Sequence, residues 1–158
     1  MTNNYKPKVY TASTLAEHQL WRTFAEDPEW HFCHFTATWP YKAHLEWEAA
    51  EPPNSDVLRE AWQTNVKEIK DSDFVLLYAR LATVPKLRGA LVECGVAIAD
   101  GIRIVAVGLD PEHTWSAHHL VIHVPTLREA RNYLLRYTVM IPPRTRKSLD
   151  AQSSDDND

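Results

Sequence analysis

Two apolar segments restrict the fold of this chain more than any other feature. Phe74 to Tyr78 (FVLLY) is apolar without alternation, and Ile102 to Val107 (IRIVAV) follows nearly the same pattern. A strand that faces solvent on one side alternates apolar and polar residues, whereas a strand of a helix-covered parallel sheet is apolar on both faces. The two segments therefore predict central strands of a parallel sheet.

Three more segments are predicted as strands, and helical patterns separate them. The additional strands are Lys8 to Ala12, His31 to Thr38 and Leu120 to Val124. Five strands interleaved with helices predict an α/β fold, a single-domain open sandwich in which helices flank a five-stranded, mostly parallel sheet of the Rossmann or flavodoxin-like kind.

The helices are indicated by capping residues and by apolar residues at helical spacing. Thr14 with Glu17, and Thr126 with Glu129, fit the capping box that opens a helix. The helix before the central strand is predicted from residues that recur at helical spacing: Leu58, Ala61, Trp62, Asn65, Val66 and Ile69.

The chain is expected to form one domain over residues 1–147, because domains most often hold about 100–150 residues. Residues 148–158 form an acidic tail without apolar periodicity and are expected to be disordered. The segment from Tyr41 to Asp56 contains Pro52 and Pro53 and is predicted to be a long loop, a kind of segment that is often functional.

Charge and cysteine content exclude several classes of partner. A net charge of −4 argues against a binder of polymeric nucleic acid or of anionic membranes. The two cysteines, Cys33 and Cys94, cannot form a disulfide framework, and no apolar segment is long enough to span a membrane. The sequence favours a soluble cytoplasmic protein.

One carboxylate stands inside an apolar segment. Glu93 lies in the stretch LRGALVECGVAIADGIRIVAVG, which is typical of a helix that leads into a buried strand. Its helical neighbours three and four residues away are Gly89, Ala90, Val96 and Ala97. Ligands of open α/β sheets bind beyond the carboxyl ends of the strands, and Glu93 is expected about one turn inside a helix that begins there.

The order of these features resembles the nucleoside 2-deoxyribosyltransferase family over roughly Lys8 to Leu135. Members have a tyrosine-containing turn at the end of the first strand, an aspartate just before the central strand, and a G-x-x-x-E-x-G-x-A helix with the catalytic glutamate. This chain has Tyr10 in KVYTAST, Asp73, and Gly89-Ala-Leu-Val-Glu93-Cys-Gly95-Val-Ala97 in matching places.

The resemblance implies an enzyme that cleaves, and in some cases transfers, the N-glycosidic bond of a nucleoside. Glu93 would be the nucleophile, Asp73 the acid that assists departure of the base, and Tyr10 a hydrogen-bond partner of Glu93 or of the sugar. Ser13 and Thr14 would receive a phosphate or a sugar hydroxyl, and Gly89 with the neighbouring alanines would leave room for the furanose ring.

One departure from the family pattern concerns the phosphate. Some members have an acidic residue just before the motif glycine, where it binds the sugar 5′-hydroxyl. Here Lys86 and Arg88 stand in that stretch, which makes a nucleoside 5′-monophosphate a plausible substrate. The resemblance also implies a homo-oligomer and no cofactor.

Structural interpretations remain open beside the functional ones. Glu93 would be favourable at the positive end of a helix dipole, Asp73 would suit a cap between helix and strand, and Tyr10 would suit the core. His119 and His123 would share a strand face about 13 Å apart, too far for one ion, so no metal site is expected. Two other functions remain, an NAD or nucleotide-sugar glycohydrolase and a nucleotide-binding sensor without catalysis.

Overall fold

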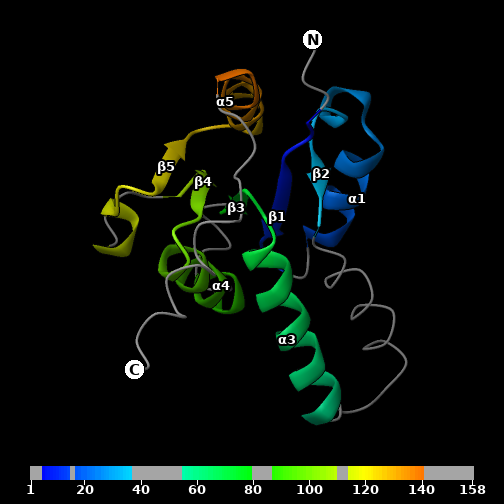
Figure 1. The fold of residues 1–158 in the computed structure, drawn as a ribbon, viewed down its shortest axis with the longest axis vertical. Helices are drawn as coiled ribbons and strands as arrows, with labels where there is room; N and C mark the ends of the chain where they lie inside the picture. Colours follow the sequence, from blue (N-terminus) through cyan, green and yellow to red (C-terminus); the bar gives the residue numbers. More distant parts are fainter. Residues whose placement is uncertain (1–4, 15–16, 37–54, 80–86, 110–113, 141–158) are drawn as a thin grey trace, which may run out of the picture.

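The computed structural model describes residues 5–14, 17–36, 55–79, 87–109 and 114–140 (Figure 1). The tail, most of the predicted Tyr41 to Asp56 loop, and Lys86 lie outside these residues. The strands are β1 (Lys8–Ala12), β2 (His34–Phe35), β3 (Phe74–Tyr78), β4 (Arg103–Val107) and β5 (Val121–Val124). The α-helices are α1 (His18–Glu26), α3 (Ser55–Lys70), α4 (Arg88–Ala99) and α5 (Leu127–Met140), with short 3-10 turns η2 (Pro28–Trp30) and η4 (Thr114–Ala117).

The five strands form one sheet in the order β2-β1-β3-β4-β5, and every pairing is parallel. This confirms the predicted fold class. The order reverses at β1, whose neighbours are β2 on one side and β3 on the other. Ligands of open α/β sheets bind at such a switch point, so the fold places the preferred crevice beside β1 and β3.

Alternate residues of the strands face two different layers of helices. Tyr10, Val75 and Leu77 join a core with residues of α3 and α4. Val9, Phe74 and Leu76 join a second core on the opposite face with residues of α1 and α5. The central strands are thus apolar on both faces because helices cover both.

Two elements differ from their sequence predictions. The strand predicted from His31 to Thr38 is reduced to His34–Phe35 within the described residues, because the chain before it turns through η2 and Cys33 bonds back to Trp30. The apolar face predicted for α3 is buried only at Ala61, Asn65 and Ile69. Leu58 and Trp62 are each 40% exposed.

The two predicted capping boxes have different outcomes. At the start of α5, the Thr126 hydroxyl accepts a bond from the Glu129 amide at 3.3 Å and donates to the Glu129 carboxylate at 3.0 Å. The box at Thr14 and Glu17 is wrong. The helix α1 starts at His18, Glu17 makes no side-chain capping bond, and the Thr14 carbonyl, in place of its hydroxyl, accepts from the Glu17 amide.

Gly108 is required where β4 ends. Its φ is +68°, and a Cβ there would lie 2.7 Å from the Ala79 carbonyl oxygen. We expect Gly108→Ala to lower the free energy of unfolding by about 2 kcal/mol, since left-handed strain and a backbone clash add. Urea denaturation measures this loss. Gly95→Ala is the matched control, because a Cβ there meets nothing within 4 Å and alanine favours the helix; equal effects of the two variants would contradict the argument.

No helix among the described residues is both long and apolar enough to cross a membrane.

Candidate active site

Glu93 is held by side chains from two other elements. It lies in the second turn of α4, on the side that faces α3. Asn65 of α3 donates from Nδ2 to Glu93 Oε1 at 3.0 Å. The hydroxyl of Tyr10, in the middle of β1, also forms a hydrogen bond with the Glu93 carboxylate. A strand and two helices therefore meet at one carboxylate, beside the strand at which the sheet order reverses.

The environment of Glu93 moves its titration to neutral pH. Burial raises the pKa of this carboxyl group to about 7, and the hydrogen bonds from Tyr10 and Asn65 offset part of that rise by favouring the charged form. Burial and the neighbouring Glu93 raise the pKa of Tyr10, so its phenol stays protonated and donates. Such a shift is common where a carboxylate takes part in chemistry.

Asn65 is the residue of this cluster that sequence reasoning did not assign to the site. It is 4% exposed and occupies the buried face of α3 between Ala61 and Ile69. A polar side chain within an apolar helical stripe must find a partner when it is buried. This rule could have marked Asn65 as a residue with a buried hydrogen-bond partner, although the sequence alone does not identify that partner as Glu93.

Asp73 lies at the opposite end of β3 from its carboxyl edge. Its Oδ2 accepts from the Lys8 backbone amide at 2.8 Å and from the Tyr5 hydroxyl at 2.6 Å. These bonds tie the segment before β1 to the helix-to-strand turn. The structure does not bring Asp73 into the cluster around Glu93, and its geometry matches the capping interpretation.

Ser13 and Thr14 follow β1 at its carboxyl end. The Ser13 hydroxyl accepts from the Trp21 indole at 2.8 Å and donates to the Thr14 carbonyl at 3.0 Å, so internal bonds occupy it. The Thr14 hydroxyl is buried and has no hydrogen-bond partner among the described residues. Of the two, Thr14 retains free bonding capacity.

The residues at the start of α4 separate into exposed and packed positions. Arg88 and Gly89 are exposed, and a Cβ on Gly89 would meet nothing within 4 Å. Ala90 and Ala97 are buried against the sheet. The two alanines thus let α4 approach the strands, whereas Gly89 faces open space.

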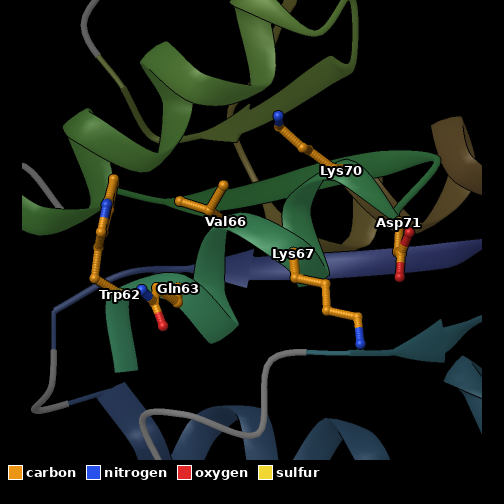
Figure 2. Close-up of a pocket in the computed structure, with 6 residues that line it drawn as sticks. All are labelled: Trp62, Gln63, Val66, Lys67, Lys70 and Asp71. Atoms are coloured by element: carbon orange, nitrogen blue, oxygen red, sulfur yellow. The ribbon is translucent and has the colours of Figure 1, made fainter. Parts of the chain in front are cut away.

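A surface pocket lies on the flank of α3 (Figure 2). Its volume is about 440 Å³, and α3 with the turn after it supplies the lining residues, Trp62, Gln63, Val66, Lys67, Lys70 and Asp71. The lining includes none of Tyr10, Asn65 and Glu93. We place the candidate site at Tyr10, Asn65 and Glu93, because these residues combine buried polar groups with a shifted carboxyl pKa.

Two histidines, one before β5 and one within it, have internal hydrogen-bond partners. His123 shares a hydrogen bond with the Ser116 carbonyl at 2.8 Å, and the His118 ring accepts from the Leu120 amide at 3.3 Å. Over the described ranges, no group of three histidine, cysteine or acidic side chains is placed to hold a metal ion.

The order of the parallel sheet and the helices on both of its faces match the nucleoside deoxyribosyltransferase-like fold. A solved structure with this fold is the CMP N-glycosidase BcmB of Clostridium botulinum. It is 16% identical to this chain at a TM-score of 0.50, and the match covers 85% of this chain and 99% of that one. No protein-family model matches the sequence, and no curated protein matches it either.

Proposed function

We propose that this protein cleaves the N-glycosidic bond of a nucleoside 5′-monophosphate or a nucleoside, with Glu93 as the nucleophile. The observation that carries the proposal is a half-buried carboxyl group with a pKa of about 7, bonded to Tyr10 and Asn65 beside the switch point of the sheet. The likeness of the fold to that of a CMP N-glycosidase supports the same class of reaction.

The reaction proceeds in two displacements at the anomeric carbon. A Glu93 oxygen attacks C1′ while the C1′–N bond breaks, and the electron pair of that bond leaves with the base, which takes up a proton. Water then attacks C1′ of the glycosyl ester, loses a proton and regenerates the carboxylate. If a second base takes the place of water, the same ester gives a new nucleoside and the enzyme is a transferase.

Tyr10 and Asn65 prepare the carboxylate for this attack. Their two hydrogen bonds fix the rotamer of Glu93, and each bond favours the ionised, nucleophilic form. A protonated Tyr10 is essential to this arrangement, and its raised pKa preserves the proton. Asp73 has no part in the proposal, because Lys8 and Tyr5 hold its carboxylate at the other end of β3.

The phosphate of a 5′-monophosphate is assigned to the start of α4. Exposed Arg88 at that start provides a guanidinium, and the N-terminus of a twelve-residue helix favours an anion. Lys86 is proposed to assist from the preceding segment. The neighbouring Gly89 has no side chain that would block the approach to the backbone amides at the start of α4.

Chromatography of a mixed pool tests the proposal. Nucleosides, 2′-deoxynucleosides and their 5′-monophosphates are incubated with the protein, once with an added free base and once without. Release of free base supports glycosidic cleavage, and a new nucleoside that forms only with the added base identifies a transferase. Absence of both products contradicts the proposal. A nucleotide that then still raised the melting temperature would indicate the sensor function instead.

A further inference from the structure

The hydrogen bond between Asn65 and Glu93 determines the orientation of the Asn65 side-chain amide. An ionised carboxylate only accepts hydrogen bonds, so the NH₂ group of Asn65 must face Glu93, as the 3.0 Å contact has it. The carbonyl oxygen Oδ1 of the same amide is therefore directed away from the carboxylate. Its orientation follows from the charge of Glu93.

This Oδ1 atom is buried and has no hydrogen-bond partner among the described residues. The Asn65 side chain as a whole is 4% exposed, so the acceptor is removed from bulk solvent. A buried acceptor without a donor is costly, and native proteins rarely keep one without a reason. A donor supplied by the substrate would remove that cost.

The stereochemistry of the proposed reaction determines which substrate donor is near. In a β-nucleotide the base leaves from one face of the furanose, and a carboxylate that displaces it directly attacks C1′ from the opposite face. The 2′-hydroxyl of ribose projects from that opposite face, on the carbon next to C1′. A group bonded to the attacking carboxylate therefore lies beside the 2′-hydroxyl.

We propose that Asn65 Oδ1 accepts a hydrogen bond from the 2′-hydroxyl of the bound sugar, so that this site selects ribose over 2-deoxyribose. The inference rests on the proposed function, and it specifies the sugar of the substrate. Asn65 then has two tasks: its NH₂ group positions Glu93, and its Oδ1 recognises the sugar. A deoxyribose leaves Oδ1 unpaired, whereas a ribose satisfies it.

Binding of the sugar products tests this inference without any turnover. Calorimetry on the wild-type protein and on Asn65→Ala would compare ribose 5-phosphate with 2-deoxyribose 5-phosphate, and ribose with 2-deoxyribose. We expect the wild type to bind the ribose member of a pair about 10-fold more tightly or better, which is the scale of one buried hydrogen bond. In Asn65→Ala the two members should bind about equally.

Two further variants separate recognition from a structural role of Asn65. Asn65→Asp retains an acceptor at this position and should keep the preference for ribose, even if both affinities fall. Gln63→Ala alters an exposed neighbour on α3 and should leave every ratio unchanged.

The inference is overturned if the wild type binds the members of each pair equally, if it binds none of them, or if Asn65→Ala retains the preference. Base release is measured separately. A protein that cleaves nucleotides with no preference at the 2′ position would refute the sugar assignment and leave the proposed function standing. A protein that binds ribose preferentially but cleaves no nucleotide would refute the proposed function and leave the sugar assignment standing.

Discussion

The variant Glu93→Gln should lose turnover by about 10³-fold or more, measured as the initial rate of base release at pH 8. An amide oxygen is a poor nucleophile, and the intermediate it would form does not return to the starting side chain as a glycosyl ester does. The change preserves the size of the side chain, so the hydrogen-bonding positions near Tyr10 and Asn65 stay occupied.

The matched control is Glu60→Gln, which makes the same chemical change at an exposed position of α3. It should keep the wild-type rate. If Glu93→Gln also released base at the wild-type rate, Glu93 would not be the nucleophile, and the carboxylate would have only a structural role.

The substitution Glu93→Gln should also stabilise the protein at high pH. The carboxyl group of Glu93 has a pKa of about 7 in the folded state against an ordinary value of 4.5, because burial disfavours its charge. The folded protein consequently binds more protons at this group than the unfolded chain between these two pH values. The contribution of Glu93 to the free energy of unfolding is therefore fully present below about pH 4.5 and is lost as the pH rises through 7.

The expected size of this stabilisation follows from the pKa shift of Glu93. A shift from 4.5 to about 7 corresponds to ~3 kcal/mol once the pH exceeds the folded-state pKa. Gln does not titrate, so the free energy of unfolding of Glu93→Gln relative to the wild type should be greater at pH 8 than at pH 4.5 by about this amount. Urea denaturation at the two pH values measures it. A relative stability that did not change with pH would show that burial does not raise the pKa of the Glu93 carboxyl group.

Loss of rate combined with a gain in stability would distinguish chemistry from structure. A carboxylate that only supports the fold stabilises the protein when charged, whereas Glu93 is most costly in the form that the proposed attack requires. Proteins retain such a cost where activity depends on it.

The central strands were predictable because both of their faces are buried. Lys8–Ala12 and Phe74–Tyr78 have the predicted bounds, and Arg103–Val107 begins one residue later than predicted. The peripheral strand β2 was predicted too long, since its neighbouring aromatic residues pack in the core from a turn as well as they would from a strand. The spacing of apolar residues indicates which side chains are buried, but it does not distinguish a strand from a turn that buries the same side chains.

The candidate site was less predictable than the fold. The family resemblance directed attention to Glu93 and Tyr10, which the structure brings together, and to Asp73, which it places elsewhere. Asn65 escaped notice because its partner is 28 positions away along the chain and no local pattern reports that separation. Its signal was a single amide in a stripe of apolar residues.

The cluster around Glu93 joins three distant parts of the chain: residue 10 of the first strand, residue 65 of one helix and residue 93 of the next. Such contacts require the closure of long stretches of chain, and the entropic cost of that closure favours their late formation in folding. Activity would therefore appear only with the last stage of assembly, and recovery of base release during refolding should follow the slowest phase of native structure formation.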